Sequence, residues 1–329
     1  MSVLVTGGGG YIGSHMVWYL CDAGEDVVVI DNLSTGFDWA IAPEARLVQG
    51  DCGDLDLLDR VIGENEVDAI IHFAGSIVVP ESVADPLGYY LNNTVKSRAL
   101  IEAAVKGGVG AFIFSSTAAV YGTPETYPVD EDAPLSPESP YGRSKLMTEM
   151  MLADASVAHG FSYAALRYFN VAGADPAGRT GQSTKGATHL IKVACEAALG
   201  KRDGLTVFGT DYPTPDGTGV RDYIHVSDLV AAHGEALRHL RAGGANLVAN
   251  CGYGHGFSVL EVADAVKRVS GKDFAVAIGP RRPGDPAAIV ASPARIKREL
   301  GWQPRNDDLD GIVASALRWE EALSRRNQR

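Results

Sequence analysis

The chain of 329 residues lacks the features of a membrane-spanning or nucleic-acid-binding protein. It has no uninterrupted apolar run of the about 18 residues that a helix needs to cross a bilayer. Its 29 lysines and arginines face 41 aspartates and glutamates, which gives a formal net charge of −12. Because binding to a phosphate backbone needs a basic surface, we expect neither a nucleic acid nor a membrane as a partner.

Cysteine is scarce, and its spacing is not that of a metal site. The four cysteines form no C-x-x-C pair, which argues against a zinc site and against a disulfide framework. We therefore expect no metal and a reducing, cytoplasmic environment for the free thiols. No basic segment followed by an apolar run precedes the first predicted strand, so we also expect no signal peptide. The cysteines are Cys21, Cys52, Cys195 and Cys251.

The first half of the chain alternates short apolar runs with segments of helix length. Strand-like runs occupy residues 3–5, 27–30, 47–48, 69–73, 111–114 and 163–166, and helix-length segments include 12–23, 54–62 and 94–106. Near-continuous apolar strands that alternate with helices are typical of parallel sheets covered on both faces. The pattern predicts an α/β fold with a doubly wound, parallel Rossmann sheet.

The second half has a different character. Residues 172–187 and 209–219 show little periodicity, whereas Ser258 and Glu261 form a capping box that opens a helix to about Val269. Residues 307–325 predict a terminal amphipathic helix. We predict a dinucleotide-binding domain over residues 1–170 that also receives about 226–253. A smaller mixed α/β substrate-binding domain over 171–329 is interleaved with it.

A glycine-rich turn follows the first predicted strand. Gly7, Gly10 and Gly13 have the spacing G-x-x-G-x-x-G, and a predicted helix follows. Glycines at such a turn let the backbone approach a pyrophosphate at the helix N-terminus. Asp31 ends the second strand, where a carboxylate binds ribose hydroxyls and repels a 2′-phosphate, so NAD is favoured over NADP. Asp51 follows the third strand and is expected to meet the adenine.

Tyr141 and Lys145 are four residues apart and therefore share one face of a predicted helix. A tyrosine titrates near pH 10, and a neighbouring cation lowers that pKa. The pair could thus act as a general base at neutral pH. Taken alone the pattern is weak, because many such pairs lie on solvated helix faces, and the nearby dinucleotide turn is what favours a catalytic role.

Several segments together resemble the extended short-chain dehydrogenase/reductases. They are Thr6 to Ser14, Asp31 to Leu33, His72 to Gly75, Phe114 to Thr117, Tyr121-Gly122 and the Tyr141–Lys145 pair. Further segments are similar to the UDP-glucose 4-epimerases within that family, and the match runs from Val3 to about Trp302. These further segments are Arg167 to Asn170, Asp211 to Thr214, Asp216 to Val226 and Arg281 to Asp285.

The resemblance implies a tightly bound NAD and a reaction without net redox change. Tyr141 would take the proton of a sugar 4-hydroxyl while the C4 hydride passes to NAD, and Thr117 would orient the 4-oxygen. The 4-keto sugar would rotate and receive the hydride on its other face. Lys145 would lower the pKa of Tyr141 and hold the nicotinamide ribose. The implied cofactor-binding residues are Gly7, Gly10, Tyr11, Ile12, Gly13, Asp31, Asn32, Asp51, Cys52, Phe73, Ala74, Gly75, Asn92, Ser115, Tyr141, Lys145 and Tyr168.

The same resemblance assigns the second half to a UDP-sugar. Arg221 and Arg282 would hold the diphosphate, because guanidinium groups match phosphate oxygens, and Asp285 would hold ribose hydroxyls. Each arginine alone could equally form an ordinary surface ion pair. His225 is interpreted as structural, and a homodimer is implied. The other implied substrate residues are Asn170 near the diphosphate or sugar, Leu190 and Phe208 around the uracil, Thr117 and Tyr141 at the sugar, and Ile289.

Four positions depart from the family pattern. Thr117 stands where a serine is common, and either hydroxyl can donate the same hydrogen bond. Cys52 stands where an apolar residue is common and is interpreted as a small buried apolar residue. Ile77 stands where the best-known members carry a lysine that approaches the cofactor, so one cofactor contact is missing or replaced. Ile289 stands where a tyrosine closes the sugar pocket in glucose-restricted members. The smaller side chain suggests that UDP-GlcNAc and UDP-GalNAc, or UDP-xylose and UDP-arabinose, are also substrates.

Three other functions compete with epimerisation. A nucleotide-sugar dehydratase or decarboxylase would need acid/base carboxylates after the catalytic hydroxyl, where this chain has Ala118 and Ala119. A reductase would exchange NADPH, which Asp31 disfavours. A non-catalytic NAD-sensing regulator would typically have lost Tyr141 or Lys145, and this chain keeps both.

Overall fold

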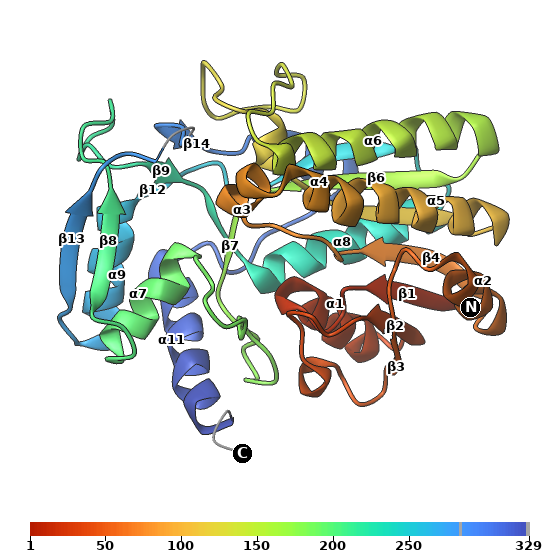
Figure 1. Cartoon of the computed structure of the whole chain (residues 1–329), viewed down its shortest axis with the longest axis horizontal. Helices are drawn as coiled ribbons and strands as arrows, with labels where there is room; N and C mark the ends of the chain where they lie inside the picture. Colours follow the sequence, from red (N-terminus) through yellow and green to blue (C-terminus); the bar gives the residue numbers. More distant parts are fainter. Residues whose placement is uncertain (283–284, 327–329) are drawn as a thin grey trace.

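A seven-stranded, all-parallel sheet forms the centre of the protein, in the order β11-β6-β5-β4-β1-β2-β3 (Figure 1). The structure is a computed structural model that describes residues 1–282 and 285–326, with side chains up to Leu323. It confirms the predicted α/β fold. The strands are β1 (Ser2–Thr6), β2 (Val27–Asp31), β3 (Arg46–Gln49), β4 (Val67–His72), β5 (Ala111–Thr117), β6 (Ser162–Tyr168) and β11 (Leu247–Cys251).

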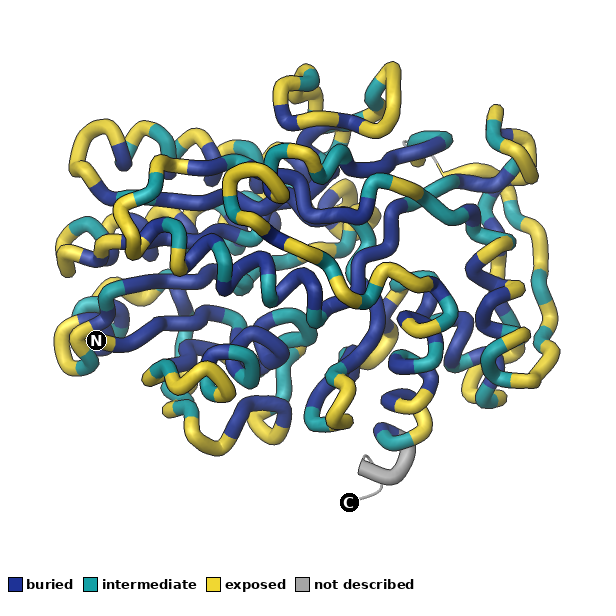
Figure 2. Tube along the Cα trace, turned by 180° about the vertical axis from the view of Figure 1, so that it is seen from behind, coloured by how far each residue is buried: buried dark blue, intermediate teal, exposed yellow. Residues whose placement is uncertain are grey.

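Helices cover both faces of this sheet, and successive strand residues alternate between two cores. In β1, Val3 and Val5 pack with residues of α1 (Tyr11–Asp22) and α8 (Val226–Arg241), whereas Leu4 packs on the other face. That second face is covered by α2 (Leu55–Glu64), α5 (Lys96–Lys106) and α6 (Pro140–His159). Burial on both faces explains why these strands read as unbroken apolar runs, and Figure 2 shows the buried trace running through the strands.

A second, smaller group of elements lies beside the sheet (Figure 1). Here β8 (Gly204–Phe208) pairs in parallel with β13 (Ala275–Gly279), next to α7 (Leu190–Ala198), α9 (Val259–Ser270) and α11 (Leu309–Arg326). The predicted capping box is present, because Ser258 and Glu261 each accept a hydrogen bond from the other's backbone amide. The chain returns to the large sheet through α8 and β11, while the division into two domains stays a prediction.

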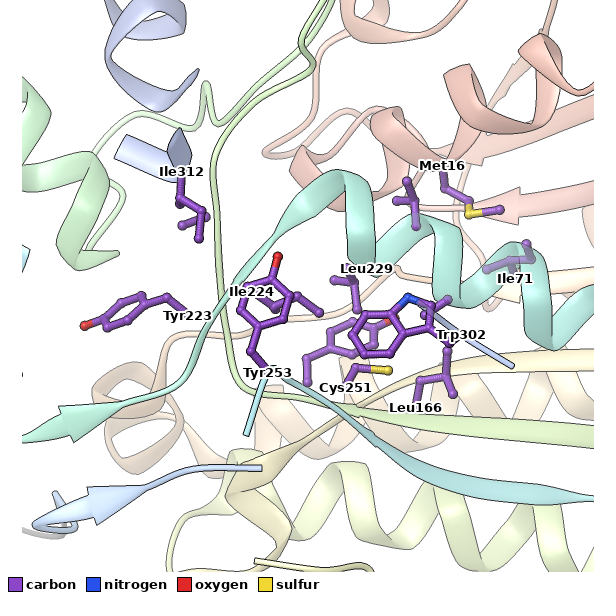
Figure 3. Packing of buried hydrophobic residues seen from close by; sticks show 14 of the residues in the cluster. Met16, Ile71, Leu166, Tyr223, Ile224, Leu229, Cys251, Tyr253, Trp302 and Ile312 are labelled. Atoms are coloured by element: carbon purple, nitrogen blue, oxygen red, sulfur yellow. The ribbon is translucent and has the colours of Figure 1, made fainter. Parts of the chain in front are cut away.

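The core joins these two groups of elements around the fully buried Trp302 (Figure 3). The Trp302 indole packs in one cluster with Leu229, Cys251 and Leu166, and its nitrogen donates a hydrogen bond to the Asp228 carbonyl at 3.0 Å. The Asp228 carboxylate accepts hydrogen bonds from the backbone amides of the segment after Trp302. The C-terminal segment is thus fixed against α8, and α11 follows from it.

Several short elements have no counterpart in the sequence prediction. A parallel pair joins β7 (Asn170–Ala172) to β10 (Tyr223–His225), and β9 (Val220–Arg221) lies between β12 (Phe257–Ser258) and β14 (Ala288–Ile289). Two or three residues are too few to show a period, so only the structure reveals them. The other short helices are α3 (Val79–Ala84), α4 (Pro86–Tyr89), the π-helical η2 (Tyr90–Val95), η1 (Asp38–Ala40), η3 (Ala118–Val120) and α10 (Ala294–Leu300).

Most element boundaries differ from the predicted ones by one to three residues. The fourth strand ends at His72 and not at Phe73, and α5 is preceded by a π-helical turn that contains Thr94.

Among residues 1–282 and 285–326, no helix combines the length and apolarity of a membrane span. In the same residues no group of three His, Cys, Asp or Glu side chains is arranged to hold a metal ion.

Candidate functional site

The turn between β1 and α1 can be built only from glycine at two positions. Gly7 has a φ of +75°, and a Cβ added there would lie 2.6 Å from the backbone nitrogen of Ala74. A Cβ on Gly13 would lie 2.1 Å from the Gly7 carbonyl oxygen. The glycines therefore let the turn, α1 and the end of β4 approach one another, and Phe73, Ala74 and Gly75 follow β4 at this edge.

The N-terminus of α1 is suited to an anionic group. Gly10 caps the helix without a side-chain hydrogen bond, and no acidic residue lies in the first turn. Its amides therefore have no competing carboxylate, and the helix dipole favours a negative charge. A shallow depression adjoins this turn and is also lined by Gly181 and Thr184 of the second half. The residues present thus fit the diphosphate part of a dinucleotide.

Asp31 lies at the end of β2 and is held by the glycine turn. Its two carboxylate oxygens accept hydrogen bonds from the backbone amides of Gly9 and Leu33, at 2.8 and 2.7 Å. A carboxylate has further acceptor capacity for ribose hydroxyls. The side chain of the neighbouring Asn32 instead accepts from the Ser34 amide. This arrangement orients Asp31 before any ligand arrives.

Asp51 and Cys52 lie just after β3. Asp51 forms an ion pair with Lys96 at 2.5 Å and accepts the Gly53 amide at 2.8 Å, so a structural role exists beside the predicted adenine contact. Cys52 is buried in the core on the α2 side of the sheet, which agrees with its interpretation as a small apolar residue. All four cysteines are free thiols.

The structure brings Tyr141, Lys145 and Thr117 together. Ser139 caps α6 by accepting the Gly142 amide, which starts the helix one residue before Tyr141. The Tyr141 phenol lies near the hydroxyl of Thr117, at the end of β5, close enough for that hydroxyl to lower the pKa of the phenol. Lys145 is buried one turn further along α6, and its ammonium donates to the Ser115 carbonyl at 3.0 Å. The phenol, the hydroxyl and the ammonium therefore meet at the carboxyl end of β5.

Burial sets the electrostatics of this pair in the cofactor-free chain. It raises the pKa of Tyr141 above its usual value, and the Thr117 hydroxyl only partly offsets this. Burial also lowers the pKa of Lys145, to about 8. The activation of the phenol by Lys145 together with a positively charged nicotinamide ring stays a prediction.

Further side chains surround the predicted nicotinamide position. The Tyr168 hydroxyl bonds to Nε2 of His233, whose ring lies 5.0 Å from that of Phe73. The buried Asn93 donates to the Ser144 hydroxyl and accepts the Ser76 amide, which ties α6 to the segment after β4. The predicted Asn92 donates to the Ser76 hydroxyl. His233 and Asn93 were not predicted from the sequence, because neither lies in a segment that carries the family resemblance.

A hollow of about 480 Å³ lies between the glycine turn, β7, α7 and α11. Tyr11, Asn170, Leu190, Tyr223 and Trp319 are among its lining residues. Two predicted substrate residues thus face the same space as Tyr11 of the dinucleotide turn. The predicted Phe208 is not in this lining; its ring lies under the Arg282 guanidinium, 3.8 Å from the charge. Leu190 and Phe208 therefore do not share this cavity.

Arg221 and Arg282 differ from the neighbouring Arg281. Arg281 pairs with Asp211 at 2.6 Å and stacks on Tyr212. Within the described residues, neither Arg221 nor Arg282 forms an ion pair; Arg221 donates only to the Val220 carbonyl, at 2.9 Å. The chain has a net charge of −12 and therefore many carboxylates that could pair with an arginine. That these two guanidinium groups pair with none of those described favours a role in binding an external anion. Asp285 is exposed beside them.

Ile289 lies beside Arg221 and near the turn that follows β5. It is aligned with Arg221 in the pairing of β14 with β9, and it packs in one buried cluster with Ala118 and Tyr121. The two alanines after Thr117 form a short 3₁₀ turn, whose Ala119 amide donates to the Thr117 hydroxyl. Ile77 is half exposed. His225 is structural as expected, because its ring caps α8 and contacts Ser315.

Known proteins with similar sequences and structures were compared with this chain. Residues 3–252 match the model of the NAD dependent epimerase/dehydratase family. This chain belongs to that family. A UDP-glucose 4-epimerase of Azospirillum brasilense is 60% identical over 321 residues, which cover 98% of this chain and 92% of that protein.

Solved structures of the family superpose closely on this one. The UDP-glucose 4-epimerase of Brucella ovis in complex with NAD is 45% identical, with a TM-score of 0.94 over 96% of this chain and 97% of that one. The UDP-Glc/GlcNAc 4-epimerase of Campylobacter jejuni is 48% identical, with a TM-score of 0.86 over 98% and 99%. Membership of this NAD-dependent family confirms the predicted cofactor.

The pKa of Tyr141 is expected to depend on the cofactor. In the cofactor-free protein the phenol should titrate above pH 10, because burial opposes the phenolate. Binding of NAD should lower that pKa, because the nicotinamide ring carries a positive charge. The ultraviolet difference absorbance between the wild type and Tyr141→Phe, recorded over pH with and without NAD, measures the shift. An unchanged pKa on loading would contradict this account.

Proposed function

We propose that the chain is a UDP-glucose 4-epimerase that interconverts UDP-glucose and UDP-galactose through a 4-keto intermediate, with NAD retained between turnovers. The observation that carries the proposal is the proximity of the Tyr141 phenol to the Thr117 hydroxyl, with the buried Lys145 bonded to the Ser115 carbonyl of the same strand. Bound NAD supplies the acceptor and the donor of the hydride. The chain itself supplies a proton acceptor, a hydroxyl that orients the sugar oxygen, and a buried cation.

The roles of these side chains follow from their chemistry. A sugar 4-hydroxyl placed between Tyr141 and Thr117 can give its proton to the phenolate and recover it from the phenol. Thr117 can donate to the same oxygen, although its own oxygen accepts the Ala119 amide. Ala118 and Ala119 offer no acid or base to remove a C5 proton, which supports epimerisation over dehydration. The proposed reaction therefore inverts a single carbon, C4, and can run in both directions.

Arg221 and Arg282 are the proposed anchors of the UDP diphosphate. Their lack of a carboxylate partner in the described residues supports this, as does the position of Arg282 over the Phe208 ring. Asn170 and Leu190 line the hollow beside α7, whose lining includes neither arginine. Asp285 is the proposed ribose contact. Binding at a fixed diphosphate leaves the sugar free to present either face of C4 to the nicotinamide, while its 4-oxygen stays near Tyr141.

The first experiment tests the activity itself. The purified protein, incubated with UDP-galactose, should form UDP-glucose, detected by a coupled NADH signal. Tyr141→Phe keeps the ring and removes the proton acceptor, so turnover should fall by about 100-fold or more while NAD remains bound. Failure of the wild type to turn over any UDP-sugar, despite bound NAD, would favour the non-catalytic regulator.

Arg282 and Arg281 provide a matched pair of variants. Arg282→Met should raise KM for the UDP-sugar by about 10- to 100-fold with a smaller change in kcat, because it removes charge-assisted hydrogen bonds to the diphosphate. Arg281→Met removes a guanidinium that is already paired with Asp211 and should change KM little. Equal effects of both variants on KM would contradict the assignment.

Broader sugar specificity is the second candidate function. Ile289 is buried against Ala118, directly after Thr117 in sequence, and the relative in Campylobacter jejuni is described as a UDP-Glc/GlcNAc 4-epimerase. We expect UDP-GlcNAc to be a substrate, and Ile289→Tyr to lower kcat/KM for UDP-GlcNAc by about 10-fold or more relative to UDP-glucose, because the larger ring takes up room for the N-acetyl group. Ile289→Leu conserves volume and serves as the control. No measurable turnover of UDP-GlcNAc by the wild type would exclude this specificity.

A homodimer is proposed through an exposed apolar surface on adjacent helices. Leu87, Leu91 and Val95 recur every four residues along α4 and η2 and are 78%, 55% and 52% exposed. Met147 and Met150 are exposed on α6, which packs against these helices. Apolar patches of this kind mark contact surfaces, and the regular spacing fits a partner helix from a second copy.

Sedimentation tests the dimer. The wild type should run at twice 34.7 kDa, and Leu87→Glu with Leu91→Glu should run as a monomer because charges at the contact oppose association. Ile278→Glu changes an equally exposed apolar residue on β13 and should leave the dimer intact. A monomeric wild type would disprove the assignment.

The free thiols support a reducing cytoplasm as the compartment, where the enzyme would serve galactose metabolism.

A further inference from the structure

Glu149 and Arg167 form a buried ion pair directly behind the catalytic strand. Their side chains are 7% and 4% exposed. Two parallel hydrogen bonds join them, from Nε to Oε1 at 3.0 Å and from Nη2 to Oε2 at 2.7 Å. Such a two-pronged geometry fixes distance and orientation together. The pair joins α6, which carries Glu149, to β6, which carries Arg167.

The position of Glu149 on α6 connects this pair to the proposed reaction. Tyr141, Lys145 and Glu149 are each four residues apart and therefore form one stripe along the helix. Glu149 also accepts a hydrogen bond from the hydroxyl of Ser116, the residue before Thr117. One carboxylate thus ties the helix that carries the phenol to the strand that carries the hydroxyl.

The same network continues to the substrate side. The remaining Arg167 nitrogen donates to the Tyr121 hydroxyl at 2.9 Å, and Tyr121 donates to Asn250 at 2.7 Å. The Asn250 side chain donates to the Val129 carbonyl, and the Val129 amide donates to the carbonyl of Val290, next to Ile289 in sequence. Buried hydrogen bonds therefore connect α6 with Val290, the residue that follows β14.

A buried ion pair is weak evidence for a stabilising role. The cost of removing two charges from water often equals or exceeds their attraction, and apolar replacements of similar volume can be neutral or stabilising. What such replacements cannot reproduce is the fixed geometry. A displacement of about 1 Å at a reacting group can cost on the order of 100-fold in rate.

We propose that Glu149 and Arg167 are positioning residues that hold the Tyr141 phenol beside the Thr117 hydroxyl. The proposal rests on the proposed function, because the phenol and the hydroxyl act on one sugar oxygen. Neither residue needs to touch substrate or cofactor. The network sets the separation between α6 and the end of β5, and that separation sets the geometry of proton transfer.

The test replaces the pair by apolar residues of similar size. Glu149→Met with Arg167→Met should fold with a Tm near that of the wild type and retain NAD. Its kcat for UDP-galactose should fall by about 10-fold or more with KM within about twofold, because only the geometry of the reacting groups changes. In the NAD-loaded double variant, the pKa of Tyr141 should rise relative to the wild type, because the phenol is no longer held beside the Thr117 hydroxyl that lowers this pKa.

Two further variants make the result decisive. Arg167→Lys keeps the cation without the planar guanidinium and should also lower kcat, which covers the case in which the double variant fails to fold. Asp68→Leu with Arg241→Met removes a similar two-pronged pair at the amino end of β4 and should leave kcat unchanged. Wild-type kcat and an unchanged Tyr141 pKa in a folded double variant or in Arg167→Lys would overturn the proposal. An inactive wild type would instead reject the proposed function.

Discussion

Parallel pairing of β1, β4, β5 and β6 is the constraint on which the site depends. Because parallel strands end at one edge of the sheet, the glycine turn, the segment after β4 and Thr117 are brought together although they are far apart in sequence. Helix α6 then packs along β5 and β6 and places Tyr141 over that edge. The chemistry of the site therefore follows from the strand order.

Burial determines the character of the groups at this edge. It raises the pKa of Tyr141 and lowers that of Lys145 to about 8, so it shifts both groups toward their neutral forms. The proposed reaction then needs the charge of the cofactor as well as that of Lys145. Guanidinium groups with different partners complete the site: Arg167 is satisfied by Glu149, whereas Arg221 and Arg282 have no carboxylate partner among the described residues.

Much of the fold could be predicted because its signals are local. Strands that are buried on both faces appear in the sequence as unbroken apolar runs. The turn requires glycine because a Cβ at Gly7 or Gly13 would lie only 2.6 or 2.1 Å from a backbone atom. The ends of elements were less well defined, as the fourth strand shows. The strands β7, β9 and β14 were missed because two or three residues carry no period.

The sequence by itself determined the Rossmann sheet, the dinucleotide turn, the helical spacing of Tyr141 and Lys145 and the family resemblance, because each rests on residues close together in the chain. Tertiary structure decided the rest. It directed Lys145 to the Ser115 carbonyl, paired Arg281 but not Arg282 with a carboxylate in the described chain, and set Ile289 against Ala118. It also joined Glu149 to Arg167 and Ser116. These contacts link residues far apart in sequence, and their partners are chosen by packing and by the satisfaction of buried charge.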